Sequence, residues 1–302
     1  MPRSVRVTEV VVERVAGAVG SRALDNSSVA SAETIAATGF PRRRVSGEDE
    51  GLFELSLRAA KAALGGIQPA EVGGVVVASF SNPSRFPGLA VKLASELGVD
   101  PSAPALDLQA ACSAYPQALY AAGRIASDTG MKVLLIDGDV QSPLVDAADS
   151  STVPLFSDAS TATVVSSSIQ GSRFSEFGFL SRSSDALSCA AEGPIRMDGF
   201  KVFSFVASDV TKFLREFGQD FDLFVPHQAN MYMVRQLAKS LGLENKLVTC
   251  GSEFANPGSA SVPLALALHG RPGRALVAGF GAGLSAAASV VRIADGAALG
   301  LA

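Results

Sequence analysis

ALDLQAACSAYPQALYAAGRIAS, residues 105–127, joins a short apolar segment to an Ala-rich amphipathic one. This pattern predicts a buried strand that ends near residue 108, a tight turn, and a helix over about residues 114–127. Cys112 lies at the turn, where the unpaired N–H groups of the helix start and the positive end of its dipole favour thiolate over thiol. A cysteine in this position tends to be a nucleophile, so Cys112 is the first candidate catalytic residue.

Apolar, β-branched segments alternate with helical patterns along the rest of the chain. The predicted strands are residues 5–12, 75–79, 105–108, 132–137, 161–166, 223–225, 275–279 and 288–293. The predicted helices are residues 52–64, 89–97, 114–127, 199–217, 231–241 and 262–268. Short, nearly continuous apolar strands between helices indicate an α/β protein whose strands are buried on both faces.

The two parts of the chain have a similar outline, because in each a strand leads through a turn with polar residues into a helix. This similarity suggests an internal duplication of roughly 150 residues. We expect an N-terminal half at residues 1–170, which contains Cys112, and a C-terminal half at residues 171–302. The connection between them is expected within the Gly-, Ser- and Arg-rich residues 170–184.

Composition excludes several classes of function. The chain has 302 residues, is 48% hydrophobic and 18% charged, and has a net charge of −4, which is typical of a globular protein with a large core. Apart from Arg42–Arg44 it has no basic block, so bulk charge gives no sign of nucleic-acid binding. Its three cysteines are far apart, which favours a reducing compartment over a disulfide framework or a metal site. With neither a signal peptide nor a long apolar run, the sequence predicts a cytoplasmic protein.

Three further places could complete a site around Cys112. His227 follows the apolar residues 221–225, and Asn256 lies in a turn-rich loop before a predicted helix. The Gly-rich turn at residues 279–285 joins two predicted strands and would let backbone N–H groups approach a substrate closely. Acyl transfer through a thioester needs a thiolate, a hydrogen-bonding partner and donors for the developing oxyanion, and these places offer each.

Plainer interpretations exist for each of these residues. A cysteine in an apolar context is commonly a core residue, a histidine is commonly structural, and Asn256 could be a turn residue before Pro257. Cys189, Cys250 and His269 have no flanking motif, so we expect structural roles for them. The turn at 279–283 superficially matches a dinucleotide loop, but it leads into another apolar segment instead of a helix.

Six motifs occur in the order found in one enzyme family. The chain resembles β-ketoacyl-[acyl-carrier-protein] synthase III, a condensing enzyme of the thiolase superfamily, and its departures identify it as a divergent member. The motifs are AACS at 110–113, FSDASTA at 156–162, MDGFKVF at 197–203, VPHQAN at 225–230, Asn256 with SAS at 259–261, and FGAG at 280–283.

The resemblance implies a fold of two duplicated βαβαβ halves in a five-layer α-β-α-β-α sandwich, with His and Asn supplied by the C-terminal half. It implies that Cys112 holds the acyl group, while His227 and Asn256 stabilise the enolate formed when a malonyl-type thioester decarboxylates. The N–H groups of Cys112 and Ala282 would form the oxyanion hole. Phe86 would reach across a homodimer to the partner's acyl pocket, although a heterodimer is also compatible with the resemblance.

The resemblance also implies that no cofactor is permanently bound, and that the substrates are thioesters of coenzyme A or of the phosphopantetheine of an acyl carrier protein. Departures from the family concern this donor. Glu33 and Ala37 replace a Trp and an Arg that clamp coenzyme A in typical members. Phe200 and Ser204 replace an Asn and a Lys that often lie near the pantetheine, and Tyr232 replaces an Arg that is common two residues past the HQAN motif. We therefore expect Phe86, Phe200, Ser204 and Tyr232 to shape the substrate pocket, with fewer cationic contacts to the donor.

Three functions are compatible with these residues. The first is decarboxylative condensation in fatty-acid or specialised, polyketide-like biosynthesis. The second is an acyltransferase or a non-malonyl condensing enzyme on the same fold. The third is a non-catalytic partner subunit of a ketosynthase heterodimer, which the presence of Cys112, His227 and Asn256 disfavours. None of these three functions is expected to involve a metal, a membrane or a nucleic acid.

Overall fold

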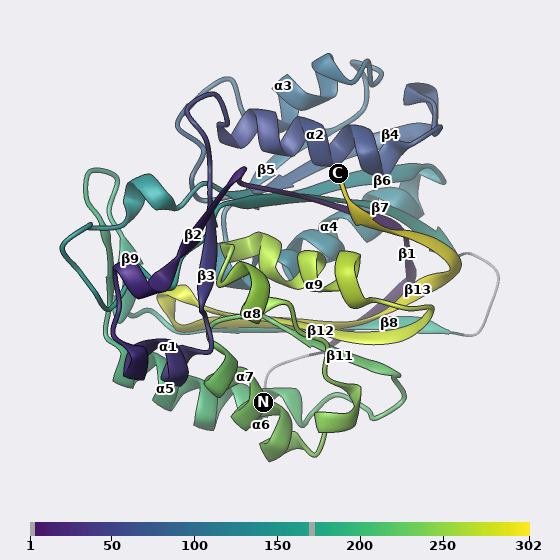
Figure 1. Cartoon of the computed structure of the whole chain (residues 1–302). Helices are drawn as coiled ribbons and strands as arrows, with labels where there is room; N and C mark the ends of the chain where they lie inside the picture. The colour runs from purple at the N-terminus through teal and green to yellow at the C-terminus, as the bar shows by residue number, and fades with distance from the viewer. Residues whose placement is uncertain (1–3, 169–172) are drawn as a thin grey trace.

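The computed structural model describes residues 4–168 and 173–302, whose strands and helices form alternating layers (Figure 1). The strands are β1 (Val5–Val19), β2 (Arg22–Asp25), β3 (Arg42–Val45), β4 (Val72–Ala78), β5 (Ala105–Leu108), β6 (Lys132–Asp139), β7 (Ala159–Ser168), β8 (Phe174–Ser181), β9 (Leu187–Cys189), β10 (Ile195–Met197), β11 (Leu223–Pro226), β12 (Gly273–Gly281) and β13 (Ser285–Leu301). The α-helices are α1 (Ala32–Thr38), α2 (Leu52–Leu64), α3 (Leu89–Glu96), α4 (Ala114–Thr129), α5 (Gly199–Phe205), α6 (Thr211–Leu214), α7 (Met231–Leu241), α8 (Gly251–Phe254) and α9 (Ser261–His269).

The layers are built on one hydrogen-bonded sheet of nine strands in the order β11-β12-β13-β8-β1-β7-β6-β4-β5, with a further pairing of β13 and β1. Figure 1 shows α4 and α9 between its two parts, α2 and α3 outside β4, β6 and β7, and α5, α6 and α7 beyond β11 and β12. The predicted α-β-α-β-α sandwich is therefore confirmed. The long strands β1 and β13 link the two parts of the sheet, and the register of β1 shifts between Val12 and Arg14.

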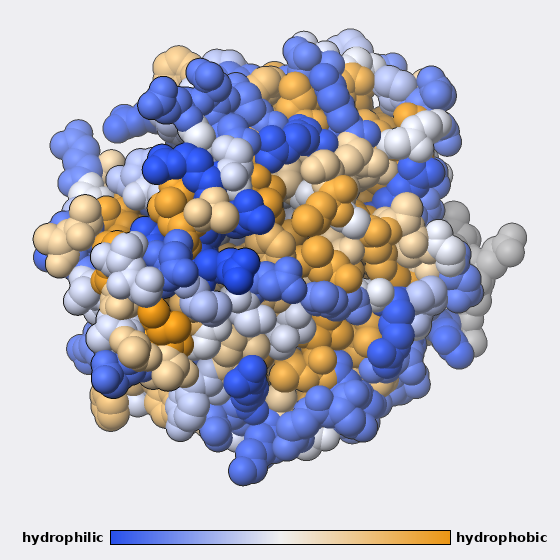
Figure 2. Space-filling view, in the orientation of Figure 1, coloured by the Kyte–Doolittle hydropathy of each residue, from blue (hydrophilic) through white to orange (hydrophobic). Residues whose placement is uncertain are grey.

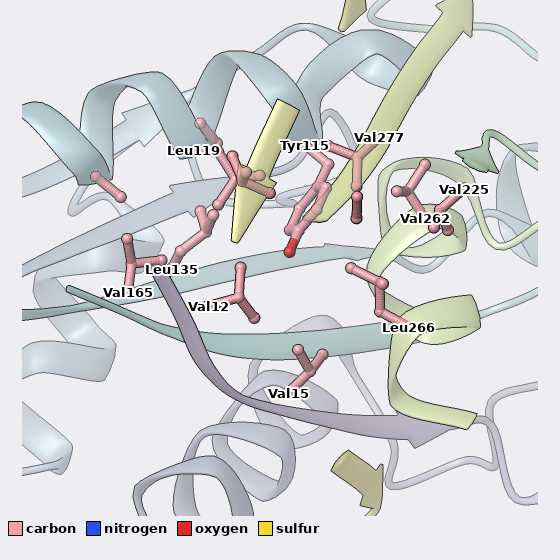
Figure 3. Close-up of a cluster of buried hydrophobic side chains, with 14 of the residues drawn as sticks. Val12, Val15, Tyr115, Leu119, Leu135, Val165, Val225, Val262, Leu266 and Val277 are labelled. Carbon is pink, nitrogen blue, oxygen red and sulfur yellow. The ribbon is translucent and has the colours of Figure 1, made fainter. Parts of the chain in front are cut away.

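The two central helices are buried to different degrees. Helix α4 is amphipathic, with Leu119 and Ala122 in the core and Arg124 exposed. Every residue of α9 from Ser261 to Ala267 is buried, as expected for a helix without a polar face. Helix α4 comes very close to β1, since a Cβ at Gly123 would lie 2.5 Å from a methyl carbon of Val10. Figure 3 shows how side chains from α4, α9 and the strands on both sides of them meet in one core.

The outer surface follows from the same arrangement. Figure 2 shows polar residues over most of one face, with apolar residues gathered over the region where α9 and the end of β13 lie in Figure 1. Leu299 of β13 packs against the buried cluster that contains α9. The C-terminal end of β13 thus closes the core over this helix.

Several elements differ from the sequence-based prediction. The stretch expected to connect the halves contains β8, which pairs with both β1 and β13. The predicted helix 199–217 is interrupted by a π-helical turn at Val206–Val210. The two-stranded sheets β2–β3 and β9–β10 were not predicted. The boundary between residues 170 and 171 lies outside the described residues, so the division into two halves stays a prediction.

Candidate active site

Cys112 is presented by a sharp turn between β5 and α4, as the sequence predicts. The residue before it, Ala111, has φ of 43°, a conformation that residues other than glycine rarely adopt and that often marks a functional site. The side chain is buried, and β12 passes directly beside it. A Cβ at Gly279 would lie 2.6 Å from the Cys112 carbonyl oxygen, and one at Gly281 would lie 3.2 Å from its sulfur. Glycines on β12 are therefore what allows this strand to approach Cys112.

Two backbone N–H groups face the Cys112 sulfur, namely those of Ala282 and of Cys112 itself. The Ala282 turn is held against the start of α4, because the hydroxyls of Ser113 and Ser285 lie 2.9 Å apart. The positive φ angles of this turn are at Gly281 (147°), Gly283 (67°) and Leu284 (47°), and not at Ala282. A donor at position 282 consequently does not need glycine there.

Cys112 is nevertheless a thiol in the resting protein. Burial raises its pKa to about 11, and the charge of Asp139 acts in the same direction, while the two N–H groups act against both. The sequence-based expectation that the helix start favours the thiolate is wrong for the resting state. Removal of the sulfur from water outweighs the backbone donors.

His227 follows β11 and is held rigidly. Its backbone N–H donates to Ala278 at 2.7 Å, and its Nδ1 lies 2.6 Å from the hydroxyl of Ser261 at the start of α9. The ring of Phe280 packs at right angles to the imidazole, with centroids 5.6 Å apart. Burial lowers the pKa of His227 to about 3, so the imidazole is neutral. Because Ser261 contacts Nδ1, Nε2 is the nitrogen left for a substrate.

Asn256 lies in the loop between α8 and α9, and this loop is fixed through its backbone. The Asn256 N–H donates to the Leu155 carbonyl at 2.9 Å, and the Asn256 carbonyl accepts from Ser157 N at 3.0 Å and from Gln141 Nε2 at 3.0 Å. Its side-chain oxygen accepts the N–H of Gly258 at 3.0 Å. This arrangement leaves the amide NH₂ of Asn256 as the free donor of the side chain.

Two cavities meet around these residues. The larger, of about 450 Å³, is lined by Cys112, Ala282, Phe80 and Gln141, and we call it the Cys112 cavity. The smaller, of about 70 Å³, is lined by His227 and Asn256, and we call it the His227 cavity. Phe156 and Leu187 line both. Gly281 lines the His227 cavity, and a Cβ added to it would lie 3.2 Å from the Cys112 sulfur. The fold therefore brings Cys112, His227, Asn256 and Ala282 to one junction.

The four residues predicted to shape the substrate pocket lie elsewhere. Phe200 is 79% exposed, and Tyr232 is 54% exposed and stacks on Phe203 with centroids 6.1 Å apart. Phe86 is 86% exposed on the loop before α3. Among the described residues that line the two cavities, none is Phe86, Phe200, Ser204 or Tyr232. A role of these residues with a donor or a second subunit stays a prediction.

Sequence reasoning missed several residues of the site. Phe80, Gln141 and Leu187 line the Cys112 cavity without belonging to a motif. Cys189 was expected to be structural, but it is exposed and also lines this cavity. Cys250 is buried in the core, as expected. The available signal for Gln141 was its place just after a buried strand, where functional residues of α/β sheets gather.

Over residues 4–168 and 173–302, no three His, Cys, Asp or Glu side chains are grouped so that they could hold a metal ion. Within the same residues, no helix combines the length and apolar character needed to cross a membrane.

Comparison with known proteins relates this site to one family. Residues 106–183 match the model of 3-oxoacyl-[acyl-carrier-protein] synthase III, and residues 218–293 match the model of its C-terminal part. β-Ketoacyl-[acyl-carrier-protein] synthase III of Lactobacillus delbrueckii subsp. bulgaricus is 31% identical over 284 residues, which cover 85% of this chain and 88% of that protein.

Solved structures agree with the sequence matches. A 3-oxoacyl-(acyl-carrier protein) synthase from Burkholderia xenovorans superposes with a TM-score of 0.91 at 26% identity, over 99% of this chain and 98% of that one. A priming β-ketosynthase of a polyketide biosynthetic pathway superposes with a TM-score of 0.87 at 31% identity, over 96% of this chain and 99% of that one. The chain belongs to the β-ketoacyl-[acyl-carrier-protein] synthase III family, whose members are ketosynthases and hence acyltransferases of the thiolase fold.

Proposed function

We propose that the chain condenses an acyl group held on Cys112 with a malonyl-type thioester. In the first half, the Cys112 sulfur attacks the carbonyl of an acyl thioester, its proton passes to the departing thiol, and the acyl group stays on the enzyme. In the second half, the malonyl-type thioester loses CO₂, and the resulting enolate attacks the acyl carbonyl. The bond from carbonyl to Cys112 sulfur then breaks, which gives a β-ketoacyl thioester and, after protonation, the free thiol.

The observation that supports this proposal is the pair of neutral donors in the cavity that adjoins the Cys112 cavity. His227 is uncharged because it is buried, and Asn256 has a free amide donor on the same narrow cavity. Two neutral donors stabilise an enolate oxygen without adding net charge. The Cys112 cavity opens on the other side of Phe156 and gives room for the acyl chain. The acyl group and the enolate would thus meet next to Gly281.

The N–H groups of Ala282 and Cys112 are the proposed oxyanion hole for the acyl carbonyl. Both already face the sulfur, and such donors stabilise the tetrahedral intermediate of acyl transfer by several kcal/mol, roughly 3 to 4 for one donor. They also explain how a buried thiol reacts, because charge forms at the sulfur and at the carbonyl oxygen within reach of the same two N–H groups.

The proposed donors are thioesters of coenzyme A or of an acyl carrier protein, as the family name implies for the carrier protein. We assign no permanently bound cofactor. Phe200, Ser204 and Tyr232 lie on or next to α5 and α7, and we place the donor's carrier on this side of the molecule. The pathway is fatty-acid or polyketide biosynthesis, and the location of the protein is expected to be the cytoplasm.

A homodimer is proposed at the free edge of the sheet. Strand β5 is the last strand in the order, and its Leu106 is 46% exposed. Phe86 and Val91 are also exposed large apolar residues, and exposed apolar side chains on an edge strand favour pairing with another chain. Light scattering coupled to size exclusion tests this, and a monomer at micromolar concentration would contradict it.

The direct test of the proposed function measures the two halves separately. Intact-mass spectrometry with a panel of acyl-CoA and acyl-carrier-protein thioesters should show one acyl group added at Cys112, and labelled malonyl thioesters should release CO₂. Acylation without any CO₂ release would instead support an acyltransferase on the same fold.

A further inference from the structure

Asp139, at the end of β6, accepts five hydrogen bonds although it has no exposed surface. One carboxylate oxygen accepts from Ser79 Oγ at 3.0 Å, from Phe80 N at 3.0 Å and from Ser81 Oγ at 3.2 Å. The other accepts from Ser259 N at 3.1 Å and from Ser259 Oγ at 2.7 Å. A carboxylate with this many donors is held as an anion with a fixed orientation.

These donors come from two loops that build the site. Phe80 lines the Cys112 cavity, and Ser259 belongs to the loop in which the Gly258 N–H binds the Asn256 side chain. Gly258 has φ of 62°, and a Cβ there would lie 2.7 Å from Asp139 Oδ2. The loop of Asn256 can therefore reach the carboxylate only with glycine at position 258.

Asp137, two residues earlier on β6, provides a contrast. Within the described part of the chain, neither of its buried carboxylate oxygens has a hydrogen-bond partner. Burial raises its pKa well above the ordinary value, and the nearby charge of Asp139 adds to this. Burial thus favours the neutral form of Asp137. Burial also raises the pKa of Asp139, but the hydrogen bonds from Ser259, Phe80 and Ser79 act against that rise and stabilise the Asp139 anion. Of these two carboxyl groups on β6, Asp139 is therefore the one whose negative charge is stabilised by donors.

We propose that Asp139 is a positioning residue, whose carboxylate ties the Asn256 loop to the Phe80 loop and places one negative charge near Cys112. The proposal rests on the proposed function in so far as Asn256 serves decarboxylation. Two consequences follow. Loss of the carboxylate releases Asn256 from its position, and loss of the charge removes a repulsion from an anion at Cys112.

Asp139→Asn tests both consequences, because it keeps the size of the side chain but replaces one acceptor oxygen by an NH₂ group that faces other donors. CO₂ release from a malonyl thioester should fall roughly 10- to 100-fold, since small misplacements of a catalytic group cost this much. Covalent acylation at Cys112 should not fall, because that half does not use Asn256 and loss of the charge favours an anion at the sulfur.

The charge is tested without any substrate. Alkylation of Cys112 by anionic iodoacetate and by neutral iodoacetamide is followed by mass spectrometry of the peptide that contains Cys112. In Asp139→Asn the rate ratio of iodoacetate to iodoacetamide should rise about threefold or more. A variant that only loosens the fold would speed up both reagents and leave their ratio unchanged.

Two further variants separate position from charge. Asp137→Asn changes a neighbouring buried carboxyl that is already neutral, so both the CO₂ release and the alkylation ratio should stay as in the parent. Ser259→Ala removes one donor to Asp139 and keeps the charge, so CO₂ release should fall several-fold while the ratio stays constant. It also serves if Asp139→Asn does not fold.

The proposal is overturned if Asp139→Asn releases CO₂ at the parent rate, if Asp137→Asn loses it to the same extent, or if the alkylation ratio does not change. If the parent protein itself releases no CO₂, the proposed function fails. The alkylation ratio then still decides whether Asp139 places its charge beside Cys112.

Discussion

The Cys112 cavity and the His227 cavity meet at Phe156 but differ in size and lining. The first holds about 450 Å³ and is lined by polar residues such as Gln109, Arg182 and Asp185 as well as by apolar ones. The second holds about 70 Å³ and is lined mainly by apolar side chains, with His227, Asn230 and Asn256 as its polar groups. Under the proposed function, the larger cavity would take the acyl group and the smaller one the malonyl-type thioester, so we expect less tolerance for size on the second side.

Burial shifts the pKa values of Cys112 and His227 in opposite directions, yet it leaves both side chains uncharged. It raises the pKa of the Cys112 thiol and lowers the pKa of the His227 imidazole, so both groups are neutral near pH 7. A site that starts without a thiolate–imidazolium pair must create charge during the reaction. The backbone donors at Cys112 and the amide of Asn256 are placed where that charge would form.

Cys112→Ala removes only the nucleophile that is acylated, and it should have the largest effect of these variants. No covalent acyl group should be detected by intact-mass spectrometry, because the nucleophile is missing, while CO₂ release from a malonyl thioester should persist at His227 and Asn256. Cys250→Ala is the matched control, since it removes a buried thiol outside both cavities. Acylation of the Cys112→Ala protein would contradict the assignment.

Asn256→Ala makes the reciprocal change. CO₂ release should fall about 100- to 1000-fold, the typical cost of one donor to a developing oxyanion, while acylation of Cys112 stays near the parent rate. Labelled malonyl thioester and intact mass measure the two halves on the same sample. Equal loss of both would show that Asn256 only supports the structure.

Gly281→Ala tests the boundary between the cavities. The added Cβ would lie 3.2 Å from the Cys112 sulfur, at a φ of 147° that disfavours a side chain, so the rate of acylation should fall by roughly 10-fold or more. Gly296→Ala is the control, because this glycine also has positive φ but nothing lies within 4 Å of the added Cβ. Similar acylation rates in the two variants would show that the close approach at residue 281 is unimportant.

The smallest expected effect is a difference in pH dependence between alkylation of Cys112 and CO₂ release. Alkylation of Cys112 by iodoacetamide should rise about tenfold per pH unit from 7 to 10, because the thiolate fraction grows towards a pKa of about 11. CO₂ release should show no titration of a histidine between pH 5 and 8, because the pKa of His227 is about 3 and its neutral form dominates throughout. An inflection near 6.5 in CO₂ release would contradict a neutral, buried His227.

Much of the site could be predicted from local sequence. The turn before Cys112, the strand before His227 and the loop of Asn256 are each encoded by a short apolar segment followed by polar or small residues. The ionisation of Cys112 could not be predicted in this way, because it depends on burial beneath β12, more than 160 residues away in the chain. The helix dipole is a local effect, whereas the desolvation that outweighs it results from tertiary packing.

The missed elements have a similar cause. Strand β8 was hidden because Gly, Ser and Arg surround its phenylalanines, and only pairing with β1 and β13 makes it a strand. Asp139 could not be singled out from local sequence, since its five donors come from residues about 60 and 120 positions away. The resemblance alone assigned four further residues to the substrate pocket, namely Phe86, Phe200, Ser204 and Tyr232. Their contacts with a donor or a second subunit depend on another molecule, so they cannot be predicted from this sequence.

A single-turnover reaction shows in one experiment whether the acyl group on Cys112 is used for decarboxylative condensation. Protein that has been acylated at Cys112 and freed of excess donor is mixed with a labelled malonyl thioester, and acyl-enzyme, CO₂ and product are measured together. Decarboxylative condensation predicts that one CO₂ and one β-ketoacyl thioester appear for each acyl group that leaves Cys112. Loss of the acyl group to a thiol or to water, without CO₂ and without a new carbon–carbon bond, would contradict it.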